Sequence, residues 1–232
     1  ASLKKKRKPC MIGMGAMTDP YIPLEDQLLY TRRALEIIDR NGFGVTLITK
    51  SSRVLRDIDI LKSIQTHSKC VIQMTLTTYD EELCKIIEPN VSTTKERFET
   101  LLTLHEEGIP TIVWLTPILP FINDNEENLR GILDYCIKAR VQGIICFDMG
   151  VTLREGNREY FYSKLDQHFP GLKEKYINKY GNSYILSSPQ NKYLMRIFHQ
   201  VCEENGIMHN HEDIFNYLRA YVDYRTNLLD FI

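Results

Sequence analysis

Short apolar runs alternate with longer amphipathic stretches along the first 150 residues. The apolar runs are rich in β-branched and aliphatic residues, which is typical of buried strands. The longer stretches carry apolar residues at helical spacing and end on stop signals such as Asn41-Gly42. Strands are predicted at Cys10–Gly15, Val45–Thr49, Cys70–Leu76, Thr111–Leu115 and Gly143–Phe147, and helices at Leu24–Arg40, Val54–Gln65, Glu81–Ile87, Thr94–Glu107 and Glu126–Arg140.

This order of strand and helix, repeated about five times with short connections, predicts a parallel sheet with helices packed outside it. We therefore expect an α/β fold of the barrel type, built from successive βα units. The pattern changes after Asp148, where further helices are predicted at Arg154–Phe169, Lys173–Tyr180, Asn191–Asn205 and Glu212–Ile232. We predict a partial barrel over residues 1–150 and a helical C-terminal extension packed on it over residues 151–232.

An unbroken basic run at Lys4–Lys8 directly precedes Pro9. Because lysines favour the negative end of the helix dipole, this run fits the last turn of a helix that precedes the first predicted strand. A solvated tail without structural meaning is the alternative. A nucleic-acid patch is disfavoured because 29 Lys and Arg residues are balanced by 30 Asp and Glu residues, for a net charge of −1.

The composition is that of an ordinary globular protein, with 43% hydrophobic and 25% charged residues in a chain of 232. No apolar run approaches the roughly 18 residues of a membrane span. The six cysteines, at positions 10, 70, 84, 136, 146 and 202, are too far apart for a zinc or iron–sulfur motif. We therefore expect a cytoplasmic protein with reduced thiols, no membrane association and no metal site of its own. His209 and His211 are a weak metal candidate without an evident third ligand.

In a barrel of parallel strands, the reacting groups project from the carboxyl ends of the strands. Thr18 and Asp19 follow the first predicted strand, and their hydroxyl and carboxylate suit an ammonium group. Lys50 follows the second strand, where it could bind a carboxylate or phosphate, or serve as a Schiff-base amine. Thr75 lies near the end of the third strand. The structural alternatives are a helix cap for Asp19, an exposed loop lysine for Lys50 and strand propensity for Thr75.

The segment after the fourth predicted strand, residues 116–124, contains two prolines. Exposed backbone groups flanked by apolar side chains suit an aromatic heterocycle such as adenine, and Asn123-Asp124 resembles the N-cap of the next helix. A rigid turn followed by a cap is the alternative. Four residues after the last strand are candidates for binding substrate, or for packing one helix face, namely Arg154, Arg158, Tyr160 and Tyr162.

Six segments, in this order, resemble the spore photoproduct lyase-like radical S-adenosylmethionine (SAM) proteins, which are often labelled DNA repair photolyases. They are GAMTDPYIPLE, LITKS, IQMTLTT, KIIEPNVSTTKERFETLLTLHEEGIP, TPILPFINDNEEN and GVTLREGNREYFY, and they cover about residues 10–170. The resemblance implies a partial (β/α)6 TIM-like barrel in which SAM and a [4Fe–4S] cluster lie at the strand ends. It also implies reductive cleavage of SAM to a 5′-deoxyadenosyl radical, which abstracts a hydrogen atom from an unknown substrate.

The resemblance also assigns roles to individual residues of this sequence. It makes Thr18 and Thr75 hydroxyls that face the cofactor, and Lys50 the cation that meets the methionine carboxylate or the ribose. It also makes Asp19 a partner of the amino group of SAM. The apolar segment near the adenine consists of Pro117, Ile118 and Leu119.

The chain departs from this family in two ways. The family's cluster motif, Cys-x3-Cys-x2-Cys after the first strand, is absent from the 232 residues. We therefore expect a barrel without its first strand, cluster ligands elsewhere in a parent protein, and a chain that is inactive as given. An evolved loss of the cluster is the alternative. Ala16 stands where the true lyases have a cysteine hydrogen donor, which disfavours thymine-dimer repair.

The substrate stays open as a small molecule, a nucleic acid or a protein, and the reaction as lyase or oxidoreductase chemistry. Two other functions fit parts of the sequence. One is a non-catalytic barrel that binds an adenosyl ligand or a protein partner, and the other is a Schiff-base lyase or aldolase that uses Lys50. A barrel without its first strand would expose a sheet edge, so we also expect self-association through that edge or its covering by C-terminal helices.

Overall fold

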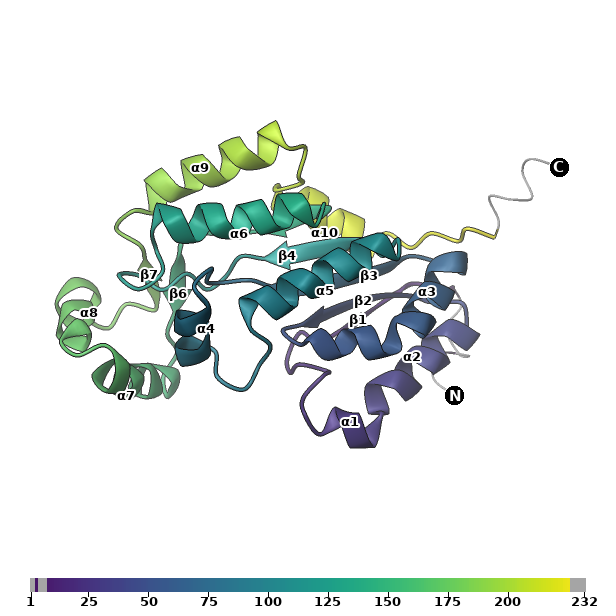
Figure 1. The fold of residues 1–232 in the computed structure, drawn as a ribbon, viewed down its shortest axis with the longest axis horizontal. Helices are drawn as coiled ribbons and strands as arrows, with labels where there is room; N and C mark the ends of the chain where they lie inside the picture. Colours follow the sequence, from purple (N-terminus) through teal and green to yellow (C-terminus); the bar gives the residue numbers. More distant parts are fainter. Residues whose placement is uncertain (1–2, 4–7, 226–232) are drawn as a thin grey trace.

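The computed structural model of the chain describes residue 3 and residues 8–225 (Figure 1). Its centre is a five-stranded sheet in the order β1-β2-β3-β4-β5, and every pairing between neighbours is parallel. The strands are β1 (Met11–Met14), β2 (Gly44–Thr49), β3 (Cys70–Thr75), β4 (Thr111–Trp114) and β5 (Gly143–Ile145). The predicted α/β fold, a partial TIM-like barrel, is confirmed.

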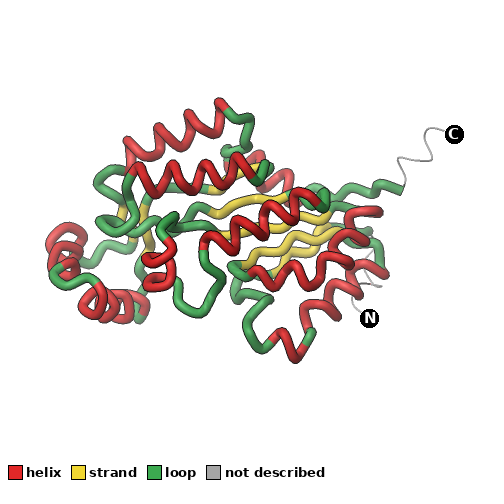
Figure 2. Tube along the Cα trace, in the orientation of Figure 1, coloured by secondary structure: helices red, strands yellow, loops and turns green. Residues whose placement is uncertain are grey.

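Helices connect successive strands and cover one face of this sheet (Figure 2). They are α1 (Glu25–Leu28), α2 (Tyr30–Arg40), the 3-10 helix η2 (Ser52–Asp57), α3 (Ile58–His67), α4 (Glu81–Ile87), α5 (Thr94–Glu106) and α6 (Glu126–Lys138). The alternation of β3 explains the layers. Cys70 and Ile72 join the large core beneath the helices, whereas Val71 points to the opposite face.

The chain after β5 contributes to three different parts of the fold. The antiparallel pair β6 (Gly150–Thr152) and β7 (Ile185–Ser187) forms a small separate core with α7 (Asn157–His168) and α8 (Leu172–Tyr180). Helix α9 (Asn191–Glu204) packs on α6, and α10 (His211–Arg219) covers the opposite face of the sheet. In Figure 1 the α7–α8 part lies at one end of the molecule, beside α4. The division of the chain at residue 150 into two units stays a prediction.

Two helix predictions are corrected by the structure. The predicted helix Leu24–Arg40 is broken at Leu29, whose φ of 53° is left-handed. The buried Glu25 carboxylate accepts the backbone N–H of Thr31 at 2.7 Å, so that N–H does not continue a helix from Gln27. The start of the predicted helix Val54–Gln65 is also different, because a 3-10 turn (η2) comes before α3.

The C-terminal helix is shorter than the predicted Glu212–Ile232. It ends at Arg219, and the following residues cross beneath the start of β3. There the Tyr224 N–H donates to the carbonyl of His67 at 3.1 Å, and the Ser68 hydroxyl donates to the carbonyl of Val222 at 2.9 Å. Residues 226–232 of that prediction, and Lys4–Arg7 of the basic run, lie outside the described residues.

The two edges of the sheet differ in their hydrogen-bonded neighbours. At the β5 edge, the N–H of Ile144 donates to the carbonyl of Met208 at 2.8 Å, and the N–H of Met208 donates to the carbonyl of Gln142 at 3.1 Å. Among residue 3 and residues 8–225, β1 is the outer strand of the other edge. Self-association through that edge stays a prediction. No helix in the same part of the chain is both long and apolar enough to span a membrane.

Candidate active site

The loop after β1 lies against the end of β2 and encloses a small cavity of about 330 Å³. Gly15, with φ of 89°, makes this approach possible, because a Cβ there would lie 2.1 Å from the carbonyl oxygen of Ile48. The cavity is lined by Gly15, Ala16, Met17, Thr18, Asp19, Ile48, Thr49, Lys50 and Thr75. The four polar residues predicted from the ends of the first three strands therefore line one cavity.

Asp19 links the loops after β1 and β2. Its carboxylate accepts the Thr49 hydroxyl and the Lys50 backbone N–H, both at 2.7 Å, and the Tyr21 backbone N–H at 2.9 Å. These contacts fix the backbone of Lys50 at the cavity wall. Through these hydrogen bonds Asp19 links the two loops, in addition to any ligand that it binds.

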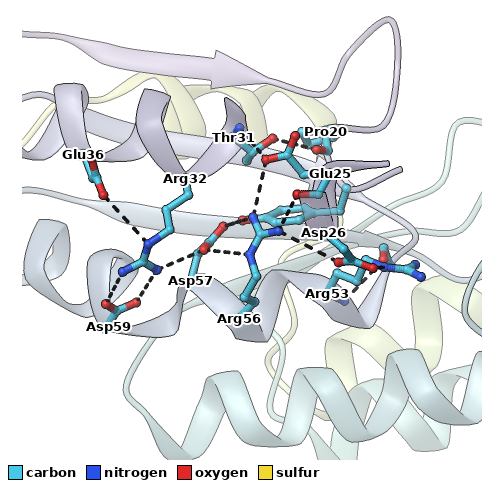
Figure 3. A network of polar contacts seen from close by, with 12 residues as sticks. Pro20, Glu25, Asp26, Thr31, Arg32, Glu36, Arg53, Arg56, Asp57 and Asp59 are labelled. Atoms are coloured by element: carbon cyan, nitrogen blue, oxygen red, sulfur yellow. Dashed lines mark hydrogen bonds and ion pairs between the residues drawn. The ribbon is translucent and has the colours of Figure 1, made fainter. Parts of the chain in front are cut away.

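A buried polar network holds the segment that follows Asp19 (Figure 3). The hydroxyl of Tyr21, a residue only 1% exposed, donates to the Asp57 carboxylate at 3.0 Å. Burial, and secondly the Asp57 charge, raise the pKa of Tyr21, so the hydroxyl stays protonated and donates. The Asp57 carboxylate is fully buried and also pairs with Arg32 at 3.1 Å and Arg56 at 2.8 Å.

A second network lies at the ends of β2 and β3 and includes two residues that the sequence reasoning missed. The Lys50 ammonium forms an ion pair with Glu88, whose other oxygen accepts from Arg97 at 2.8 Å and from the Thr77 hydroxyl at 3.1 Å. Arg97 is fully buried and also donates to the carbonyl of Thr75 at 2.9 Å. Burial by itself would raise the pKa of Glu88, but Arg97 and Lys50 outweigh it and hold that pKa below its usual value.

The sequence contains a signal for this network. Glu88 ends an apolar run at the close of α4, directly before Pro89. Arg97 shares a helix face with Leu101 and Leu104, which makes it a charged residue on the buried side of α5. A charge at such a position requires a buried partner, and Glu88 is that partner.

A larger cavity of about 940 Å³ adjoins the small one, and Lys50 lines both. Its walls come from the end of α4 and the loop after it, from the segment after β4, from the β6 region and from one face of α7. Pro117, Leu119 and Tyr160 are among the lining residues. Six of the seven predicted cofactor residues, all but Ile118, thus line two cavities that meet at Lys50.

Several of the predicted site residues line neither cavity. The Ile118 side chain is 2% exposed in the main core and lines neither cavity. Arg154 contacts the Tyr184 hydroxyl at 3.5 Å, and Arg158 donates to backbone carbonyls that include that of Ser183 at 2.5 Å. Tyr162 packs against the small α7–α8 core. Of the four residues predicted on the substrate side, Tyr160 alone lines the large cavity.

The segment after β4 is held differently from the prediction. Asn125 is the N-cap of α6, because its side chain accepts the Asn128 N–H at 2.9 Å. Asn123 instead accepts the Leu119 N–H at 2.6 Å and donates to the carbonyl of Thr77 at 2.8 Å. The peptide bond before Pro117 is cis. Asn123 therefore positions the cavity wall and does not cap a helix.

The residues of this chain do not fit an iron–sulfur cluster. Cys10 is partly buried and the other five cysteines are buried. Burial raises the pKa of Cys146 and of Cys202 to about 12, which disfavours the thiolate that a cluster requires. Within the described part of the chain, no three His, Cys, Asp or Glu side chains are grouped to hold a metal. His211 contacts the carbonyl of Cys146 at 2.9 Å.

A parallel βα sheet with cavities at the carboxyl ends of its strands defines a partial TIM-like barrel. The profile of the radical SAM superfamily matches residues 2–136, which is more than half of the chain. The chain belongs to the radical SAM superfamily.

Two uncharacterized proteins are similar in sequence to this chain. An uncharacterized protein of Methanocaldococcus jannaschii is 33% identical over 124 residues, which cover 53% of this chain and 46% of that protein. An uncharacterized protein of Mycobacterium tuberculosis is 24% identical over 169 residues, which cover 73% of this chain and 49% of that protein. The chain thus spans about half the length of these relatives.

A solved structure shares the fold. Spore photoproduct lyase complexed with dinucleoside spore photoproduct matches with a TM-score of 0.61 and 13% identity, over 88% of this chain and 61% of that chain. At 13% identity this match shows that the two proteins share a fold, and it shows nothing about function.

Proposed function

We propose that this chain is the SAM-binding core of a radical SAM enzyme of the spore photoproduct lyase-like group. The observation that carries the proposal is the convergence of Thr18, Asp19, Lys50 and Thr75 on one cavity at the strand ends. Pro117 and Leu119 line the adjoining cavity, which Lys50 shares. Superfamily membership supports SAM-dependent radical chemistry in general.

The chemistry of these side chains fits SAM. A cation at Lys50 and the hydroxyls of Thr18 and Thr75 match a methionine carboxylate and ribose hydroxyls, and Asp19 matches the amino group. The apolar wall formed by Pro117 and Leu119 suits the adenine. When bound and reduced, SAM supplies a 5′-deoxyadenosyl radical that abstracts a hydrogen atom from the substrate.

The cluster ligands are proposed to come from another part of the protein. The sequence lacks the motif Cys-x3-Cys-x2-Cys, and its six cysteines are scattered and at least partly buried. We expect the 232 residues alone to be inactive for this reason. The reaction, of lyase or oxidoreductase type, needs those thiolates.

The large cavity is the proposed substrate site. It adjoins the small cavity through Lys50, and a substrate must lie beside SAM to react. The α7 face supplies Tyr160 and Lys164 on the side away from the strand ends. The substrate is a small molecule, or a part of a nucleic acid or protein, that enters between α4 and α7.

The test uses the full-length product of the gene that encodes this chain. We expect anaerobic reconstitution to give an iron–sulfur absorbance band, and reduction to cleave SAM to 5′-deoxyadenosine. A full-length protein that holds no cluster would refute the enzymatic proposal. SAM binding without cleavage would support the second candidate, a non-catalytic adenosyl-binding barrel.

The contacts of Lys50 disfavour the third candidate, a Schiff-base enzyme. The Lys50 nitrogen is engaged by the Glu88 carboxylate, whereas Schiff-base formation requires an amine that is free to attack a carbonyl carbon. Borohydride trapping of carbonyl compounds on Lys50 should therefore fail.

A further inference from the structure

We propose that Glu88 is a positioning residue of the SAM site, which fixes the Lys50 ammonium where the two cavities meet. This inference rests on the proposed function and adds a residue to it. Glu88 lies at none of the four strand ends that supply the predicted cofactor residues. Glu88 is the residue that directly follows α4, and its side chain extends from there to Lys50.

The contacts of Glu88 point to an indirect role. One carboxylate oxygen accepts from Lys50, and the other accepts from Arg97 and Thr77. The side chain is 9% exposed. Glu88 also lines the large cavity, but its contacts with Lys50, Arg97 and Thr77 tie it to the protein, and Lys50 is its link to the small cavity. We therefore assign Glu88 a role that acts through Lys50.

Arg97 makes this position rigid. Its guanidinium donates to the carbonyl of Ser92 at 2.7 Å, to that of Thr75 at 2.9 Å and to Glu88 at 2.8 Å. Glu88 is therefore fixed relative to the end of β3, which carries Thr75. The Glu88–Arg97 pair therefore holds Lys50 and Thr75, which come from different strands, in a fixed position relative to each other.

The charge balance suits an anionic group at Lys50. The network combines two cations, Lys50 and Arg97, with the single carboxylate of Glu88, which leaves one positive charge. Lys50 is the cation that remains about one-third exposed, at 34%, while Arg97 is fully buried. Its ammonium has three donors, and Glu88 uses one of them, so two are free to meet a carboxylate such as that of methionine.

The test compares SAM with decarboxylated SAM, which lacks the methionine carboxylate, by calorimetry on the full-length protein. Lys50→Met and Glu88→Gln should each weaken SAM binding about tenfold or more and leave the affinity for decarboxylated SAM within about twofold. The double variant should bind SAM no more weakly than Lys50→Met alone, because both changes remove the same interaction. Glu107→Gln, which removes an exposed pair with Lys62, is the matched control and should change neither affinity.

Glu88→Gln leaves Arg97 buried without a carboxylate, so a variant with both Glu88→Gln and Arg97→Gln is made in parallel, and circular dichroism checks its fold. The same selective loss of SAM affinity is expected. Normal SAM binding by a Glu88 variant, normal SAM binding by Lys50→Met, or equal loss of both ligands would each overturn the inference. If the wild-type protein binds neither ligand, the proposed function itself fails.

Discussion

Buried charges near the strand ends form two separate networks, and each holds a different part of the site. Glu88 and Arg97 hold Lys50, while Asp57 holds Tyr21 and with it the loop that carries Thr18 and Asp19. Buried charges are costly unless they are paired, so networks of this kind restrict the conformations of the residues they join. The geometry of the site therefore depends on Arg97 and Asp57, which line neither cavity, as well as on Glu88, which lines the large one.

Replacing Asp57 with Asn is expected to lower the free energy of unfolding by about 2–3 kcal/mol. The change removes the buried charge that two arginines and Tyr21 share. Asp59→Asn is the control, because Asp59 pairs with the same Arg32 but its side chain is 60% exposed, so less than about 1 kcal/mol is expected. Urea unfolding followed by circular dichroism measures both values. Equal effects would contradict the structural importance of Asp57.

Glu88 should also make stability depend on pH in the acid range. Its pKa is lower in the folded protein than in the unfolded chain, so its contribution is present above the unfolded value and is lost as pH falls through the folded one. Below about pH 5, the free energy of unfolding of the wild type should therefore fall more steeply than that of Glu88→Gln. Urea titrations between pH 3 and 7 measure the two slopes. Parallel curves would show that Glu88 is not charged in the folded state.

The strand-end residues were predictable, whereas the sequence signals that Arg97 needs a buried partner but not that Glu88 is this partner. Thr18, Lys50 and Thr75 lie at or shortly after the ends of apolar strands, and parallel strands bring their carboxyl ends to one edge. Glu88 and Arg97 meet only through the packing of α4 against α5, which local periodicity does not encode. The role of Arg158 stays a prediction, because in the sequence an arginine near a strand end looks the same whether it faces a ligand or binds backbone carbonyls, as Arg158 does here.

At the scale of elements, the strands and most helices agree with the hydrophobic pattern, and the disagreements have local causes. Helix α4 has the predicted bounds, and its Asp80 cap accepts the Leu83 N–H at 2.8 Å. The pair β6 and β7 was missed because each strand has three residues and its partner is far away in sequence. Helix α10 was overextended because residues 220–225 form contacts with the sheet that helical periodicity cannot indicate.

Helix α10 is expected to contribute strongly to stability because it covers one face of the sheet. Ile214 is fully buried in a cluster with Val71, Ile112 and Ile145. Ile214→Ala should lower the free energy of unfolding by about 2–4 kcal/mol, measured by urea denaturation. Ile37→Ala, on the half-exposed side of α2, should change it by less than about 1 kcal/mol. A small effect at Ile214 would mean that α10 is not docked on the sheet.

At the scale of the whole molecule, the large cavity lies between parts with different cores. The strands β1–β5 contribute to the main core, whereas α7, α8 and the β6–β7 pair share a small core of four buried residues. A small core supports less local stability than a large one. The opposite wall of the proposed substrate site is thus the less stable part.

Hydrogen exchange measured by mass spectrometry tests this difference. Backbone amides of α7 and α8 should exchange about tenfold or more faster than those of β2–β4 under native conditions. We expect Leu186→Ala, in the small core, to accelerate exchange in α7 and α8 while the central strands keep their protection. Uniform acceleration over the whole chain would show that the two cores unfold as one unit.

Because its two edges differ, the sheet can be extended by a further strand at one edge and not at the other. Met208 occupies the outer side of β5 over residues 142–144, so within the described chain a further strand can be added only beside β1. The loop that begins at Gly15 leaves β1 at the end that borders the small cavity. A parallel strand joining there, from the same protein or from another copy, would deliver its own terminal residues next to Thr18. Completion of the sheet and completion of the cofactor site would then be a single assembly event.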